Sequence, residues 1–371
     1  MPAQKWRNAA TAMVVRKSQE ASFPFDWQIL MMKRAKTAKF MPNAAVFPGG
    51  AVDKADLDVK SWKKLFENVH GSTDFENMKN RLKYPIQPEM YQPGHFCGSE
   101  KFQSADDFPN WLVFRLTAIR ELVEESGVLV STDGVFEVSS EERNMIYNNP
   151  ESFVSFCAEK RIAPDLERLY EWSDWLTPTN ILPKRFDTMF YLITLDEDEA
   201  ENVTFQHDGS ELLTTEWLSP HQVLHRNMLE KEDEQHIHLH PPQSYELSRM
   251  MNFRQWLQLQ GYARVRPAKF GSVRWLPMVV MLRKGLMMSV MHDDYLYPED
   301  PDVMGDGARF SISDVEIEKA IEIFEDRQVP PGMAGVDRTY WDKERFNLFQ
   351  MTNYSGPGIS WMARKAESKM L

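Results

Sequence analysis

Three glutamates on one helical turn constrain this sequence more than any other feature. Residues 112–127 read LVFRLTAIRELVEESG, and apolar residues recur there every three or four positions, which predicts an α-helix with one buried face. Those apolar residues are Leu112, Leu116, Ile119 and Val123. Glu121, Glu124 and Glu125 recur with the same spacing, so their carboxylates lie side by side on another face of the helix. Gly127 predicts the end of the helix.

Carboxylates this close repel one another, and a hard divalent cation such as Mg²⁺ would offset the repulsion because it binds carboxylate oxygens. A solvated acidic helix edge is the alternative for a bare EXXEE run. The flanking residues favour the metal site. Arg120 precedes the first glutamate and Gly127 completes the pattern REXXEEXG, which resembles the second half of the Nudix box.

The first half of the same box lies upstream. Residues 46–56 read VFPGGAVDKAD, in which Gly50 is followed after five residues by an acid, Asp56, where the family usually has glutamate. About sixty residues then separate Asp56 from Arg120, so an insertion splits the box. This split and the lead-in FMPN-x-x-VFPGG at residues 40–50 resemble the peroxisomal coenzyme A and acyl-coenzyme A diphosphatase branch of the Nudix family.

The resemblance implies an α/β/α sandwich with a mixed sheet. We expect a Nudix hydrolase domain over residues 1–292, a helical insertion at about residues 57–110, and a C-terminal extension over residues 293–371. It also implies that the Gly50 carbonyl joins the three glutamates as a ligand of Mg²⁺ or Mn²⁺. We expect Arg120 to orient the glutamates by hydrogen bonding, because Glu124 is its i+4 neighbour on the helix.

The sequence also predicts individual elements outside the box. Apolar and β-branched or aromatic residues indicate strands at 11–16, 27–33 and 190–195, and a hairpin at 275–291. Helical periodicity indicates helices at 60–69, 141–161 with an interruption near Pro150, 244–259 and 313–326.

Composition excludes several classes of partner. The formal net charge is −12 and the pI is about 5.3, which argues against nonspecific binding to nucleic acid or anionic membranes. No run of eighteen apolar residues predicts a membrane span. Two cysteines are too few for a disulfide framework. A polyanionic substrate must therefore be met by a local positive patch.

Residues 33–39, KRAKTAK, supply such a patch, and Lys33, Arg34 and Lys39 are the candidates for phosphate binding. A solvated basic loop is the alternative. Arg185, in a segment that resembles the R-F-D-T-x-F motif of the same branch, is a candidate contact for pyrophosphate or adenosine. An ion pair with Asp187 or Asp196 is the alternative.

Two further groups of residues invite a functional interpretation. Nudix folds carry an acid near the strand at 211–218 that can act as a metal ligand or general base, and of Asp208, Glu211 and Glu216 we favour Glu211. His236, His238 and His240 alternate, which on a strand would place all three on one face as in a zinc site. We favour an exposed polar loop, because charged residues precede them and two prolines follow.

The function implied by the resemblance is hydrolysis of the diphosphate bond of coenzyme A or acyl-coenzyme A, giving adenosine 3′,5′-bisphosphate and (acyl-)phosphopantetheine. The alternatives are hydrolysis of another nucleoside diphosphate derivative, such as a dinucleotide, a nucleotide sugar or an RNA cap, and a catalytically idle Nudix-fold binding protein. The last three residues, KML, are close to a peroxisomal tripeptide signal, so we expect a peroxisomal location, with a mitochondrial or cytoplasmic one as alternatives.

Overall fold

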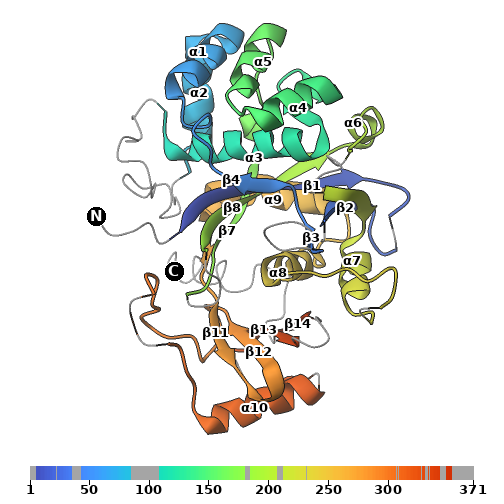
Figure 1. The fold of residues 1–371 in the computed structure, drawn as a ribbon, viewed down its shortest axis with the longest axis vertical. Helices are drawn as coiled ribbons and strands as arrows, with labels where there is room; N and C mark the ends of the chain where they lie inside the picture. The colour runs from blue at the N-terminus through green and yellow to red at the C-terminus, as the bar shows by residue number, and fades with distance from the viewer. Residues whose placement is uncertain are drawn as a thin grey trace.

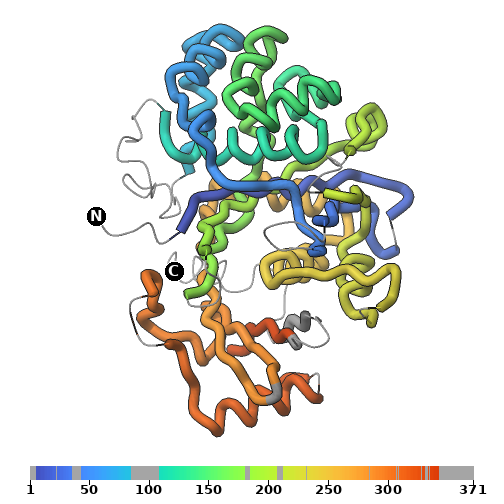
Figure 2. The backbone as a smooth tube through the Cα atoms, viewed as in Figure 1, coloured from blue at the N-terminus to red at the C-terminus, as the bar shows by residue number. Residues whose placement is uncertain are grey.

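A mixed β-sheet lies at the centre of the computed structural model, with helices on both of its faces (Figure 1). Its central strand, β1 (Arg7–Lys17), runs parallel to β8 (Phe186–Leu195) and antiparallel to β2 (Trp27–Arg34). The other strands are β3 (Ala45–Val46), β4 (Gly49–Ala51), β7 (Tyr170–Leu176), β9 (Leu212–Leu218) and β10 (Arg274–Trp275). Their order is β10-β7-β8-β1-β2-β3, with β4 added to β1 and β9 to β2. β1 and β8 lie side by side although far apart in sequence (Figure 2).

The structure describes most of the chain. The described residues are 6–21, 23–35, 43–84, 108–179, 184–206, 212–230, 232–305, 307, 309–326, 328–330, 333, 335–342 and 348–352. The C-terminal tripeptide lies outside these residues, so the peroxisomal location stays a prediction. No helix in the described ranges has both the length and the apolar character required to cross a lipid bilayer.

Alternation along β1 explains the two helical layers. Ala10 and Ala12 are fully buried on the face covered by α3 (Asn110–Ser126), and their small side chains let that helix lie close to the sheet. Met13 and Val15 point to the opposite face and pack with residues of α8 and α9. The helices on that face are α7 (Pro220–Asn227), α8 (Pro241–Met250) and α9 (Trp256–Phe270). The predicted α/β/α sandwich with a mixed sheet is confirmed.

The helices on the α3 side include the insertion. α1 (Val59–His70) and α2 (Ser72–Leu82) form a small cap beside α5 (Figure 1), and Trp62, Leu65 and Phe66 are buried as the periodicity predicted. Residues 85–107 of the insertion lie outside the described part of the chain. α4 (Ser140–Asn148) and α5 (Ser152–Lys160) lie on the same side and are separated at Pro150 as expected. The short helix α6 (Glu197–Glu201) also packs there through Ala200. A short hairpin, β5 (Val128–Ser131) and β6 (Gly134–Glu137), follows α3.

The helix predicted at 244–259 is interrupted, so that prediction was wrong. The chain leaves the helical conformation between α8 and α9, at Met251 to Gln255. Contacts with the last residue before β2 and the first residue of β2 stabilise this break. The Trp27 indole donates to the Phe253 carbonyl at 2.8 Å, and an Asp26 carboxylate oxygen accepts from the Trp256 backbone N–H at 2.5 Å. These tertiary bonds replace the intrahelical ones that a continuous helix would make.

A second sheet carries the C-terminal part. Its order is β11-β12-β13-β14, and α10 (Asp314–Asp326) packs against it in a separate apolar cluster. The strands are β11 (Met278–Met281), β12 (Leu286–Val290), β13 (Asp337–Asp342) and β14 (Leu348–Thr352). The predicted hairpin is therefore present as β11 and β12. The domain division at residue 292 stays a prediction, and in the structure it falls between two neighbouring strands of this sheet.

A buried carboxyl group joins the two parts of the molecule. The Tyr245 hydroxyl on α8 donates to Asp337 of β13 at 2.8 Å. Burial raises the pKa of Asp337 to about 7; the Tyr245 hydrogen bond opposes this rise, whereas the nearby Asp293 and Asp294 reinforce it. The folded chain therefore holds this proton at a pH where the unfolded chain has lost it.

Because the folded-state pKa of Asp337 is raised, this group makes folding less favourable as pH rises from about 4 to 7. We expect Asp337→Asn, which keeps an oxygen for Tyr245, to remove that dependence. Between pH 5 and 8 the wild type should lose roughly 2–3 kcal/mol of unfolding free energy relative to the variant. Urea unfolding of both proteins at the two pH values measures this, and parallel pH dependences would contradict the shifted pKa.

Candidate active site

The two halves of the predicted motif meet in space. α3 lies over β4, and the Gly49 backbone N–H donates to Glu125 Oε2 at 2.8 Å. α3 ends at Gly127, whose φ of 72° is left-handed and whose N–H donates to the Val123 carbonyl, as the sequence predicted. The glutamates on the last turns of the helix therefore face the Pro-Gly-Gly loop.

Gly50 has no room for a side chain. A β-carbon built at this position would lie 2.5 Å from the Glu121 carboxylate oxygens. At Gly49 an added β-carbon would lie 2.6 Å from the Ala10 carbonyl oxygen, which is backbone and cannot move aside. The two glycines thus have different roles, because Gly49 allows the strand pairing of β4 with β1 and Gly50 admits the carboxylate.

Arg120 connects the acids of both half-motifs. Its Nε and NH2 atoms donate to the two oxygens of Asp56 at 2.8 and 2.9 Å, a bidentate pair across the insertion. Its NH1 atom donates to Glu121 Oε1 and to Glu124 Oε1, each at 2.9 Å. The expected orienting role of Arg120 towards Glu124 therefore has the required geometry. Asp56, which replaces the usual glutamate, reaches Arg120 despite its shorter side chain.

Burial in this cluster disfavours the ionised forms of Glu121 and Glu124. Glu124 is 6% exposed, and burial raises its pKa to about 8, with Arg120 lowering it and Glu121 raising it further. Burial also raises the pKa of the Glu121 carboxyl group, against the lowering effect of Arg120. One guanidinium therefore does not compensate the buried carboxylates fully, and an additional cation would stabilise their charged forms.

The donor set fits a hard divalent cation. Carboxylate oxygens from Glu121, Glu124 and Glu125, and backbone oxygen at Gly50, are the ligand types that Mg²⁺ and Mn²⁺ take. Across the described ranges, however, no three acidic, histidine or cysteine side chains already stand in a complete metal-ligating arrangement. Arg120 and the Gly49 N–H hold the carboxylates instead. Metal binding therefore requires side-chain adjustment within this cluster.

Arg143 of α4 supports the end of the acidic helix, which the sequence did not reveal. Its Nε and NH2 atoms donate to the backbone carbonyls of Glu124 and Glu125 at 2.8 and 2.5 Å. Carboxylates near a helix C-terminus meet the negative end of the helix dipole, and a buried cation there offsets both charges. An exposed helix with an arginine is too common a pattern to indicate this contact.

The predicted phosphate-binding residues are not all on one surface. Lys33 and Arg34 are neighbours on β2, and neighbouring strand residues point to opposite faces of a sheet. The pairing of β2 with β9 shifts register between these two residues, so their cross-strand partners define the faces. Arg34 pairs with Leu212, which packs on the α3 face, whereas Lys33 pairs with Ala45, which packs on the α8 and α9 face. Only Arg34 lies on the face of the acidic helix. Lys39 lies outside the described residues, and the substrate roles stay predictions.

Arg185 is held by backbone carbonyls. Its Nε donates to Thr177 at 2.8 Å and its NH1 donates to Val303 of the C-terminal extension at 2.9 Å. The proposed pairing with Asp187 is not formed, because that carboxylate pairs with Arg274. These bonds link the extension to the β7–β8 connection, and a substrate contact by Arg185 stays a prediction.

Of the three candidate general bases, Glu216 alone lies among the described residues. Asp208 and Glu211 lie outside the described residues. Glu216 of β9 pairs with Arg226 of α7 (Pro220–Asn227) at 2.7 Å, a partly exposed ion pair. The preference for Glu211 therefore stays a prediction.

The histidine segment is not the exposed loop that we expected. His236 is 9% exposed, and Ile237 and Leu239 between the histidines are buried in the apolar cluster on the α8 and α9 face of the sheet. The His238 carbonyl accepts from the Ala45 backbone N–H at 2.8 Å, which attaches the segment beside β3. Ile237 and Leu239 alternate with the histidines, which is the pattern of a half-buried segment. We expected exposure because charged residues precede this segment and prolines follow it.

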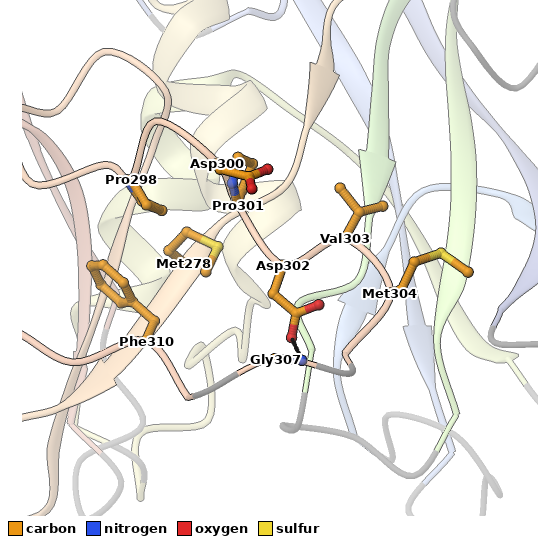
Figure 3. Close-up of a pocket in the computed structure, with 9 residues that line it drawn as sticks. All are labelled: Met278, Pro298, Asp300, Pro301, Asp302, Val303, Met304, Gly307 and Phe310. Carbon is orange, nitrogen blue, oxygen red and sulfur yellow. Dashed lines mark hydrogen bonds between the residues drawn. The ribbon is translucent and has the colours of Figure 1, made fainter.

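A cavity of about 600 Å³ is lined by Met278 of β11 and by residues between 298 and 310 of the C-terminal extension (Figure 3). Its lining combines apolar side chains with Asp300 and Asp302, and the Asp302 carboxylate accepts from the backbone N–H groups of Gly305 and Gly307 at 2.7 and 2.8 Å. None of the lining residues belongs to either half of the motif.

The Gly50 geometry makes a specific prediction. We expect Gly50→Ala to fold, because the clash is with the mobile end of Glu121, but to bind Mn²⁺ at least about tenfold more weakly, as supporting changes around metal ligands do. Gly49→Ala should instead destabilise the protein, because it meets the β1 backbone. Calorimetric Mn²⁺ titration and thermal unfolding of both variants test this. Wild-type Mn²⁺ affinity in Gly50→Ala would contradict the close approach of Glu121.

Comparisons with known proteins agree with this geometry. The sequence model of the NUDT19 Nudix domain matches residues 6–250. The chain is 31% identical over 351 residues to the acyl-coenzyme A diphosphatase NUDT19 of Xenopus laevis, covering 85% of this chain and 87% of the relative. It is 29% identical over 328 residues to the human protein of the same name, covering 81% and 82%.

A solved structure also resembles the chain. The Nudix hydrolase from Alicyclobacillus acidocaldarius is 22% identical, with a TM-score of 0.48, and the match covers 69% of this chain and 96% of that chain. The family assignment rests on the sequence matches, which span both halves of the divided box. The chain belongs to the Nudix hydrolase family, with a domain of the NUDT19 type.

Proposed function

We propose that this protein hydrolyses the diphosphate bond of coenzyme A and acyl-coenzyme A. Water attacks one phosphorus atom, the bridging P–O bond breaks, and the products are adenosine 3′,5′-bisphosphate and (acyl-)phosphopantetheine. The observation that carries the proposal is the joined acidic cluster, in which Arg120 links Asp56 to Glu121 and Glu124. The relatives named acyl-coenzyme A diphosphatase cover most of the chain and support the choice of substrate.

Nudix hydrolases use a divalent metal, and we propose Mg²⁺ or Mn²⁺ here. The ion would be held by Glu121, Glu124 and Glu125, with the Gly50 carbonyl. When bound, it supplies charge neutralisation for the diphosphate and lowers the pKa of water. The buried, mutually repelling carboxylates give the chain a reason to prefer a cation at this position.

The protein's own groups provide orientation. Arg120 fixes Glu121 and Glu124 relative to each other, and the Gly49 N–H fixes Glu125. Arg143 holds the carbonyls of the same turn and so restrains the helix end. On the same face of the sheet, Arg34 would offer its guanidinium to substrate phosphate oxygens. Positioning of this kind is the main protein contribution to phosphoryl transfer chemistry.

The substrate proposal is tested with a panel at equal concentration, containing coenzyme A, a fatty acyl-coenzyme A, a dinucleotide, a nucleotide sugar and capped RNA. We expect the coenzyme A compounds to have the highest kcat/KM with Mg²⁺ or Mn²⁺. Faster turnover of any other member would replace the proposed substrate. Tight binding without metal-dependent hydrolysis of any member would indicate a binding protein.

The role of Glu125 is tested by Glu125→Gln, which keeps an oxygen for the Gly49 N–H but removes the charge. We expect kcat to fall by at least about 100-fold, comparable to losing one preorganised electrostatic contact, with little change in melting temperature. Glu159→Gln, at an exposed position of α5, is the matched control and should leave both quantities unchanged. A Glu125→Gln enzyme with near-normal kcat would remove this residue from the metal site.

A further inference from the structure

Asp56 depends on the insertion for its position. In the usual box a seven-residue connection joins this acid to the arginine, but here the two residues are 64 positions apart. Asp56 is fully buried, and its side chain is one methylene shorter than glutamate. It can make its bidentate contact with Arg120 only if its backbone is held at the right place, because a short side chain cannot reach from a displaced one.

Trp62 of the insertion holds that backbone. Its indole Nε1 donates to the carbonyl of Ala55, the residue before Asp56, at 2.9 Å. The same carbonyl also accepts from the Asp58 backbone N–H at 3.2 Å, and the Asp58 side chain accepts from the Ser61 N–H and so caps α1. The segment from Ala55 to Trp62 is therefore one hydrogen-bonded unit that continues directly into the helix.

The indole is itself fixed to the body of the protein. Trp62 is 1% exposed, and its ring packs edge-on against Phe153 of α5 with centroids 5.5 Å apart. Phe66, on the next turn of α1, also packs against the Trp62 ring, with centroids 6.4 Å apart. The position of the Ala55 carbonyl is thus set by packing between the insertion and α5, outside the Nudix box.

A hydroxyl group on α3 restrains the carboxylate from the other side. Thr117 Oγ1 shares its proton between Asp56 Oδ2 at 2.8 Å and the Val113 carbonyl of the same helix at 3.0 Å. The Asp53 backbone N–H donates to the same Asp56 oxygen at 2.9 Å. Thr117 lies one turn before Arg120 on the helix. Both oxygens of Asp56 are therefore occupied by fixed donors.

We propose that Trp62 and Thr117 are positioning residues for the metal site. Trp62 places the backbone of Asp56, Thr117 orients its carboxylate, and Asp56 in turn fixes Arg120, whose NH1 aligns Glu121 and Glu124. The insertion helix α1 thereby replaces the short connection of the undivided box. This inference rests on the proposed metal-dependent function, and it assigns a role to α1 that neither half-motif contains.

The test measures Mn²⁺ binding to metal-stripped protein, by the loss of the electron paramagnetic resonance signal of free Mn²⁺, and needs no substrate. Trp62→Phe keeps an aromatic ring and loses the donor. Trp27→Phe is the matched control, because Trp27 is also fully buried and its indole donates to the Phe253 carbonyl at 2.8 Å in the opposite core cluster. We expect about tenfold weaker Mn²⁺ binding in Trp62→Phe, the low end of the effect of outer-shell partners, and no change in Trp27→Phe.

Substitutions of Thr117 provide a second test, which does not alter the core packing of α1. Thr117→Val has the same shape without the hydroxyl, whereas Thr117→Ser retains the hydroxyl. We expect weaker Mn²⁺ binding in the valine variant and near wild-type binding in the serine variant. In both Trp62→Phe and Thr117→Val, the KM for coenzyme A should change less than kcat, because neither substitution alters a substrate contact.

The outcomes separate this inference from the proposed function. Wild-type protein that binds no Mn²⁺ would overturn both. Wild-type binding with unchanged affinity in Trp62→Phe and Thr117→Val, or with equal losses in Trp62→Phe and Trp27→Phe, would overturn the positioning role alone.

Discussion

The charge pairing of Arg120 is the interaction on which the rest of the site depends. A buried guanidinium is tolerated only when its N–H groups have partners, and here they reach Asp56, Glu121, Glu124 and the Ala51 carbonyl. Removing any one acid would leave a buried charge with fewer partners. The cluster is therefore tightly constrained, and it brings the carboxylates of α3 into register with the loop at Gly49 and Gly50.

The surrounding fold is arranged so that this pairing can form. Alanines at positions 10 and 12 of β1 let α3 approach the sheet. In β4, Gly49 permits close pairing with β1 and Gly50 leaves room for the Glu121 carboxylate. Arg143 holds the carbonyls at the end of the helix where the carboxylates gather. The C-terminal sheet contributes none of these contacts, and it is joined to the body through Tyr245 and Asp337 and through Arg185 and Val303.

The parts of this structure that could be predicted from sequence are those with a local pattern. The periodicity of α3, the left-handed glycine at its end and the apolar face of α1 all depend on residues close in sequence. The metal acids could be named because their spacing and order resemble the Nudix box. The fold class followed from the same resemblance.

The remaining features depend on contacts between distant residues. Asp26 and Trp27 interrupt the helix expected at 244–259, and apolar alternation buries the histidine segment between charged and proline-rich flanks. Arg143, Thr117 and Trp62 each act through one or two hydrogen bonds, and such bonds produce no periodic pattern in the sequence. The opposite directions of Lys33 and Arg34 required the strand to be placed, because a run of basic residues does not show which face each one occupies.

The most direct test of the account is the position of the metal itself. Anomalous X-ray diffraction from crystals of this protein soaked in Mn²⁺ should show a peak within ligand distance, about 2.0–2.6 Å for hard cations, of carboxylate oxygens of Glu121, Glu124 or Glu125 and near Gly50. Such a peak would place the cation where the buried carboxylates require one. Well-ordered crystals with Mn²⁺ bound elsewhere, or with Arg120 still holding both glutamates and no Mn²⁺ beside them, would contradict it.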